Sequence, residues 1–262
     1  MQSSRSSIAA DHAIVVPDWP APDRVRAFTT TRLMPGNSRP PYDAFNLGLR
    51  SGEDASTVLA NRALLERALS LPSPPRWLHQ VHGDRSLRLT SEVLAGEPEA
   101  DAAFTTEPGV VLAILTADCL SILLCADCGD EIAAIHAGWR GLAAGVIETC
   151  VRRLRTPRAR LLAWLGPAIG AASYEIGVEV RDALLAHDAG ADVAFAATRP
   201  GHWSCDLYAL ARRRLQALGL GRVHGGGFDT RADARFYSHR RDGASAGRFA
   251  SVIWINADAV SA

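Results

Sequence analysis

Three apolar runs follow one another in the middle of the chain, with only a few residues between them. They cover residues 110–115, 120–125 and 131–135, and aspartate and glycine occupy the short gaps. Apolar runs of this length, bounded by turn-forming residues, are typical of buried strands. Because the strands come as a group and do not alternate strictly with helices, the pattern favours an α+β (mixed α/β) fold over a doubly wound parallel sheet. We expect the three strands to be neighbours in one sheet.

The remaining predicted elements surround this centre. Strands are predicted at 26–30, 77–82, 161–165 and 249–255, and helices at 54–70, 141–154, 178–187 and 206–218. Ser56 and Thr57 are expected to cap the first helix. The 262 residues are enough for one large core, so we expect a polar N-terminal extension at 1–24 and a single catalytic domain at 25–262, with packed mixed sheets flanked by helices.

The composition excludes several classes of function. The 28 basic residues balance 28 acidic ones, so no net charge draws the protein to nucleic acid or to a membrane, and a small-molecule partner is favoured. Every basic residue is arginine, which excludes a Schiff-base lysine and a P-loop lysine. No G-x-S-x-G elbow is present, and neither a secretory-signal pattern nor a run of about 18 apolar residues occurs. We therefore expect a cytoplasmic protein.

One cysteine and two histidines lie at the ends of predicted strands: His82, Cys119 and His136. If the strands at 120–125 and 131–135 pair as an antiparallel hairpin, the start of one lies beside the end of the other, which places Cys119 beside His136. Two imidazoles and one thiolate make a three-ligand zinc site with a fourth position open to water or substrate. A metal-free hydrolase with Cys119 as nucleophile and His136 as base would need the same two side chains.

Two other patterns leave alternatives open. His79 and His82 are three residues apart on a predicted strand, so they face opposite sides, and periodicity does not decide which one is a ligand. Cys125 and Cys128 form a single C-x-x-C pair with no helix after it, which favours turn residues over a redox or metal motif.

Seven short motifs, most of which contain glycine, occur along the chain. They are Asn46-Leu47-Gly48, Asn61-Arg62, Gln80-Val81-His82-Gly83, Thr116-Ala117-Asp118-Cys119, His136-Ala137-Gly138-Trp139-Arg140-Gly141, Gly166-Pro167-Ala168-Ile169-Gly170 and Tyr174-Glu175. From about residue 28 to the C-terminus, the chain thereby resembles the multicopper polyphenol oxidase-like, or laccase-domain, family, whose members include bacterial purine nucleoside phosphorylases and proteins named peptidoglycan-editing factors.

The resemblance implies that His82, and not His79, joins Cys119 and His136 as a zinc ligand, with copper an alternative metal in vitro. It implies phosphorolysis of adenosine and inosine to the free base and ribose 1-phosphate, with adenosine deamination and methylthioadenosine cleavage as further reactions. The expected partners are a purine nucleoside and phosphate, without nucleic acid or membrane, in a monomer or a homodimer. Substrate contacts are expected from Asn46, Arg62, Asp118 and Arg140.

Two competing functions remain. Polyphenol oxidation by a set of copper centres needs clustered histidine pairs, and the eight histidines of this chain are scattered. A cysteine amidase that edits peptidoglycan precursors would use Cys119 and His136 without a metal.

Overall fold

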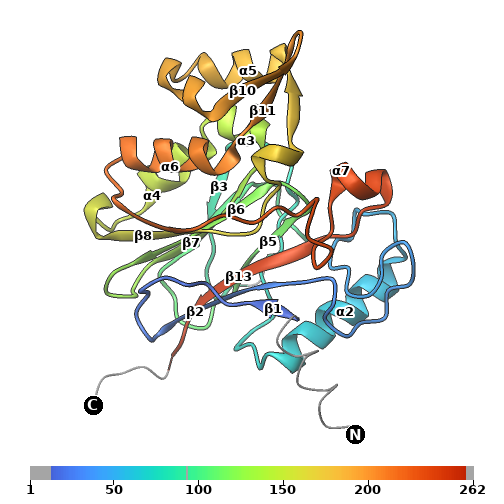
Figure 1. The fold of residues 1–262 in the computed structure, drawn as a ribbon. Helices are drawn as coiled ribbons and strands as arrows, with labels where there is room; N and C mark the ends of the chain where they lie inside the picture. Colours follow the sequence, from blue (N-terminus) through green and yellow to red (C-terminus); the bar gives the residue numbers. More distant parts are fainter. Residues whose placement is uncertain (1–12, 93, 258–262) are drawn as a thin grey trace, which may run out of the picture.

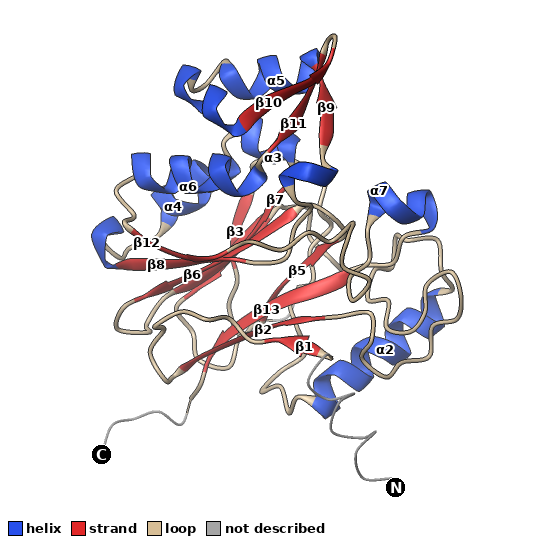
Figure 2. Cartoon of the chain, in the orientation of Figure 1, coloured by secondary structure: helices blue, strands red, loops and turns tan. Residues whose placement is uncertain are grey.

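The computed structural model describes residues 13–92 and 94–257, and these residues form stacked layers of sheet and helix (Figure 1). Their strands make a six-stranded sheet of order β12-β8-β6-β7-β4-β3, a four-stranded sheet of order β1-β2-β13-β5, and a small sheet of order β10-β11-β9 (Figure 2). The strands are β1 (Ile14–Val15), β2 (Val25–Thr30), β3 (Ser86–Arg88), β4 (Ala102–Thr105), β5 (Leu112–Thr116), β6 (Leu120–Ala126), β7 (Ile132–Ala137), β8 (Leu161–Leu165), β9 (Glu175–Gly177), β10 (Phe195–Arg199), β11 (His202–Cys205), β12 (Arg222–Gly225) and β13 (Phe249–Ile255).

The helices lie outside the two larger sheets. They are α2 (Ala55–Ala68), α3 (Trp139–Ala144), α4 (Val146–Arg153), α5 (Val178–Leu185), α6 (Leu207–Ala217) and α7 (His239–Asp242), with short 3₁₀ helices at Arg158–Arg160, Ala171–Ser173, Ala189–Ala194 and Gly243–Ser245. None of the described helices is long and apolar enough to cross a bilayer.

The six-stranded sheet is buried on both faces, which explains why its strands are continuous apolar runs. Along β6, Ile122 and Leu124 pack on the side of α4 and α6, whereas Leu123 and Cys125 pack against the four-stranded sheet. The far face of the four-stranded sheet is covered by α2 through Leu65. The order of layers is therefore helix, sheet, sheet, helix, and this confirms the mixed α+β fold expected from the sequence.

The predicted hairpin is confirmed, but the predicted single sheet is wrong for its first strand. Strands β6 and β7 are antiparallel, with Ser121 opposite His136. In contrast, β5 belongs to the four-stranded sheet and pairs with β13, where Ala113 lies opposite Val252. The partner of β5 is more than 130 residues away in the sequence, so no local pattern could have indicated it.

Three local predictions also need correction. Residues 77–82 form no strand and make only one isolated bridge, at His79; a second lies just before the segment, at Arg76. Asp54, and not Ser56 or Thr57, caps α2, because its carboxylate accepts from both of their backbone amides. The single helix predicted at 141–154 is two helices, since Gly145 between them has a φ of +89°.

The N-terminal extension predicted at 1–24 lies partly outside the described residues, which begin at 13. Within the described part, Ile14 pairs with Thr30 of β2, so this segment adds an edge strand to the four-stranded sheet. The boundary at residue 24 stays a prediction.

Replacing Gly145 should destabilise the fold. A side chain at a φ of +89° is strained, so Gly145→Ala is expected to lower the free energy of unfolding by about 1–2 kcal/mol in urea denaturation. Gly221→Ala is the matched control, because Gly221 has open space around its Cα and no positive φ. Equal stability of the two variants would contradict the assignment of Gly145 as the obligatory break between α3 and α4.

Candidate metal centre

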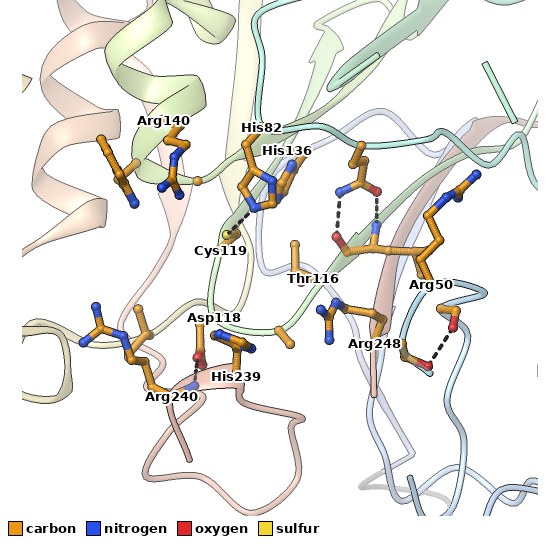
Figure 3. A pocket seen from close by; sticks show the side chains of 18 of the residues that line it. Arg50, His82, Thr116, Asp118, Cys119, His136, Arg140, His239, Arg240 and Arg248 are labelled. Carbon is orange, nitrogen blue, oxygen red and sulfur yellow. Dashed lines mark hydrogen bonds between the residues drawn. The ribbon is translucent and has the colours of Figure 1, made fainter. Parts of the chain in front are cut away.

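His82, Cys119 and His136 come together at one end of the six-stranded sheet (Figure 3). Their ligand atoms all lie within 4.8 Å of one another. The Nε2 atom of His82 is 3.8 Å from the Sγ atom of Cys119, and the two imidazole rings meet edge to face at a centroid distance of 4.8 Å. The structure thus brings together the three residues predicted as ligands, and it leaves His79 outside the cluster.

Local strand register accounts for two of the three positions. Leu120 lies opposite Ala137, so Cys119, directly before β6, lies beside the end of β7 where His136 stands. Gly138 allows this approach, because a Cβ atom there would lie 2.9 Å from the Cys119 sulfur and 3.1 Å from the His82 ring. A glycine is therefore required at position 138, where a side chain would clash with Cys119 and His82.

A buried carboxylate, Asp101, holds both histidines in place. Its Oδ1 atom accepts from the Nδ1 atom of His136 at 2.8 Å and from the backbone amide of His82 at 2.9 Å, and its Oδ2 atom accepts from the amides of Val81 and Gly83. Burial raises the pKa of Asp101, but these hydrogen bonds outweigh it and leave the pKa below its usual value. Because the carboxylate accepts from Nδ1, the Nε2 atom of His136 is free to bind a metal.

Sequence reasoning missed Asp101. It lies directly before β4, and the residues that it contacts are 18 to 35 positions away, so no motif spacing links them. The carboxylate also stabilises the backbone of His82, whose φ of +62° is unusual for a residue with a side chain.

Gln80 is a second residue whose role is visible only in the structure. Its side-chain amide donates to the carbonyl of Leu115 at 2.7 Å and accepts from the amide of the same residue at 2.8 Å. The side chain thus pairs with β5 as a strand would, and it fixes the segment that carries His82 beside the strand that leads to Cys119.

The charges in the cluster favour a thiolate. Burial raises the pKa of the Cys119 thiol, but the neighbouring His136 and His82 outweigh it and lower the pKa from 9.0 to about 6. Burial lowers the pKa of His136, but Asp101 and Cys119 outweigh it and raise the pKa from 6.5 to about 9. A deprotonated thiol is the form that binds metal ions and that acts as a nucleophile.

The donor set and its spacing fit zinc. Tetrahedral zinc with usual bond lengths places sulfur and nitrogen ligands about 3.6 Å apart, close to the 3.8 Å found between Cys119 and His82. The three residues line a cavity of about 500 Å³, so a fourth ligand would enter from there. Among the described residues, this is the one group of three or more histidines, cysteines and carboxylates close enough to hold an ion.

The four residues expected to contact substrate occupy two different places. Asp118 and Arg140 line the cavity. Asn46 and Arg62 are buried behind its wall: Asn46 accepts from the amides of Gly48 and Arg248, and Arg62 donates to the carbonyl of Leu47. Their positions indicate that Asn46 and Arg62 support the wall and do not touch a ligand in the cavity.

Asp118 has a φ of +88°, and both of its carboxylate oxygens are engaged. Oδ1 accepts from the hydroxyl of Thr230 at 2.7 Å and Oδ2 accepts from the backbone amide of Arg240 at 2.7 Å. These contacts fix the turn before Cys119 and connect it to the segment that begins α7. Further cavity residues that the sequence analysis did not assign are Tyr174, His239, Arg240 and Arg248.

Comparisons with known proteins give one consistent result. The family model of the multi-copper polyphenol oxidoreductase laccases matches residues 26–256. A purine nucleoside phosphorylase of Xylella fastidiosa is 52% identical over 252 residues, covering 92% of this chain and 96% of the relative. The purine nucleoside phosphorylase YfiH of Escherichia coli K12 is 46% identical over 243 residues, covering 92% of this chain and 98% of the relative. The crystal structure of a Neisseria meningitidis protein has a TM-score of 0.88 at 40% identity, with 93% of this chain and 99% of that chain covered.

Zinc should protect Cys119 from alkylation. In chelator-treated protein at neutral pH, iodoacetamide is expected to modify Cys119 because its thiolate opens into the cavity, and added zinc should slow the reaction at least about tenfold. Mass spectrometry of peptides resolves each cysteine. Exposed Cys128 serves as the internal control and should react equally with and without zinc, while buried Cys150 stays unmodified. Equal labelling of Cys119 in both conditions would contradict a role as ligand.

Removing the charge of Asp101 should weaken metal binding. Asp101→Asn loses the carboxylate that orients His136, so zinc affinity in a competition titration is expected to fall about 10- to 100-fold. Asp84→Asn removes an exposed carboxylate nearby and should leave the affinity unchanged. An unaltered affinity in Asp101→Asn would show that the orienting contact is dispensable.

Proposed function

Because this chain belongs to the multi-copper polyphenol oxidoreductase laccase family, we propose that it is a zinc-dependent purine nucleoside phosphorylase that cleaves adenosine and inosine with phosphate. The observation that carries the proposal is the opening of the three-ligand cluster into a cavity whose wall also holds arginines, among them Arg140. Relatives named purine nucleoside phosphorylase, at 46–52% identity over nearly their whole length, support this choice of reaction.

Phosphorolysis forms a bond between a phosphate oxygen and C1′ of the ribose. The bond from C1′ to the purine nitrogen breaks, and the purine leaves with that electron pair and takes up a proton. The protein must therefore hold an anion and a flat base next to each other. Arg140 supplies charge for the phosphate, and apolar wall residues such as Leu78 and Ile169 suit the purine.

Bound zinc would supply Lewis acidity that orients or polarises the nucleophile. Residues of the chain favour the binding of zinc in two ways. Asp101 keeps the Nδ1 proton on His136 and presents Nε2 to the cluster, and the imidazoles keep Cys119 deprotonated. Arg140 in the cavity wall is exposed, so solvent and substrates can reach it.

A cysteine amidase acting on peptidoglycan precursors is the second candidate, and one contact favours it. Asp101 hydrogen-bonds to His136, and Asp101 together with Cys119 raises the pKa of His136 against the effect of burial. This order of acid, base and thiol is that of a cysteine hydrolase, in which the carboxylate orients the imidazole that activates the nucleophile. Metal dependence distinguishes the two candidates.

Product analysis tests the proposal directly. The zinc-loaded protein is incubated with adenosine, with and without phosphate and with and without a chelator, and the purines are separated by chromatography. Phosphate-dependent adenine that disappears with the chelator is the expected result. Inosine without phosphate would indicate deamination, and hypoxanthine would indicate both reactions. No nucleoside turnover, together with chelator-resistant cleavage of a peptidoglycan precursor, would replace the proposal with the amidase.

A ligand substitution links the metal to the reaction. His136→Ala is expected to lose bound zinc and to lower kcat/KM for phosphorolysis more than about 100-fold, because it removes a ligand and one of the four donors of Asp101. His79→Ala is the matched control, since His79 lies outside the cluster, and it should keep both zinc and activity. A metal-free His136→Ala protein that still cleaves inosine with phosphate would rule out the zinc-dependent mechanism.

A further inference from the structure

The hydroxyl of Tyr174 lies in the wall of the cavity without a protein partner among the described residues. The residue is 8% exposed, and it lines the same cavity as Cys119. Two other tyrosines use their hydroxyls: half-buried Tyr208 bonds to Ala168 and Gly166, and buried Tyr237 bonds to Phe45 and Tyr42. A hydroxyl group in a cavity wall without a protein partner is available to a ligand.

Two arginines line the same cavity as Tyr174, and one of them stacks on its ring. The guanidinium of Arg240 lies over the Tyr174 ring, 4.7 Å from its centroid, and its Nη1 atom donates to the carbonyl of Glu175 at 2.8 Å. The guanidinium of Arg140 lies over the ring of Trp139 at 4.4 Å. Arg140 and Arg240 are drawn on one side of Cys119 in Figure 3, and Arg248 is drawn on the other. Stacking on a ring restricts a long side chain, so both guanidinium groups are oriented before a ligand arrives.

The electrostatics of Tyr174 agree with this arrangement. Burial raises the pKa of its hydroxyl above the usual value, so the group keeps its proton and remains a donor at neutral pH. The charges of Arg240 and Arg140 act on the same hydroxyl in the opposite direction by a smaller amount, which is consistent with both guanidinium groups lying near it.

No carboxylate neutralises these two arginines among the described residues. The nearest acidic side chain in sequence to Tyr174 is Glu175, and its carboxylate binds Arg199 at 2.9 Å and Thr198 at 2.7 Å. The carboxylate of Asp118 in the cavity wall accepts from Thr230 and from the backbone of Arg240. The two positive charges therefore face the cavity unpaired, and an anion is the ligand that they favour.

We propose that Tyr174, Arg140 and Arg240 form the subsite that binds inorganic phosphate, on the side of the metal cluster away from Arg248. Two guanidinium groups and one hydroxyl offer donors in several directions, which suits a tetrahedral dianion better than a planar base or an uncharged sugar. This inference rests on the proposed function for the identity of the anion, and Tyr174 and Arg240 are new members of the binding site.

Isothermal titration of the zinc-loaded protein with inorganic phosphate tests the subsite without turnover. Arg240→Gln is expected to raise the Kd for phosphate roughly 10- to 100-fold, and Tyr174→Phe, which removes only the hydroxyl, roughly fivefold or more. Arg181→Gln is the matched control: Arg181 also lies over an aromatic ring, that of Trp203 at 4.9 Å, but it pairs with Asp192 and does not line the cavity. Zinc content should stay unchanged in all three variants.

Steady-state kinetics provides a second readout. Both substitutions at the subsite should raise the KM for phosphate and leave the KM for inosine within about twofold, because the nucleoside is held elsewhere. If wild-type protein cleaves inosine but Tyr174→Phe and Arg240→Gln bind phosphate as wild type does, the subsite is wrong and the proposed function stands. If no nucleoside is cleaved but the variants lose phosphate binding, the proposed function is wrong and the subsite stands.

Two other outcomes would overturn the subsite. A loss of phosphate affinity in Arg248→Gln, with none in Arg240→Gln, would move the anion to the opposite wall. Variants that lose affinity for a nucleoside 5′-monophosphate and keep their affinity for inorganic phosphate would show that the residues recognise a phosphorylated nucleoside and not the free ion.

Discussion

The carboxylate of Asp101 is the contact on which the geometry of the cluster depends. It accepts from three successive backbone amides around His82 and from the ring of His136, so one buried group fixes two of the three ligands. An unpaired carboxylate would be costly in a buried position, and four donors make its burial favourable. Because the same oxygen binds both histidines, a shift of either one disturbs the other.

The rest of the fold brings segments that are separated in the sequence together at the metal cluster. The β6–β7 hairpin brings Cys119 beside His136, the side chain of Gln80 ties the His82 segment to β5, and Thr230 with the Arg240 backbone holds Asp118. The two contacts of Asp118 join parts of the chain more than 100 residues apart. The cavity is consequently formed by turns and strand ends. The two packed sheets are rigid, and they hold these irregular segments in position.

The same cluster is compatible with more than one chemistry. A thiolate held by two imidazoles binds a metal, and a thiolate with a histidine and an aspartate behind it resembles a cysteine nucleophile. The distinction lies in what enters the cavity. A bound metal ion would neutralise the thiolate and supply a Lewis acid, whereas the unpaired arginines of the same cavity would attract an anion.

The sequence by itself determined the features that depend on neighbours along the chain. Apolar runs and turns predicted β6, β7 and their hairpin, and the residue types at His82, Cys119 and His136 predicted a metal site. The sequence did not determine the sheet to which β5 belongs, the break at Gly145 or the role of Asp101. Nor could it distinguish Asn46 and Arg62, which support the cavity wall, from Arg140, which lines the cavity. Those features depend on pairings between residues remote in sequence. Periodicity reports which face of an element is buried, but only tertiary packing decides what lies against that face.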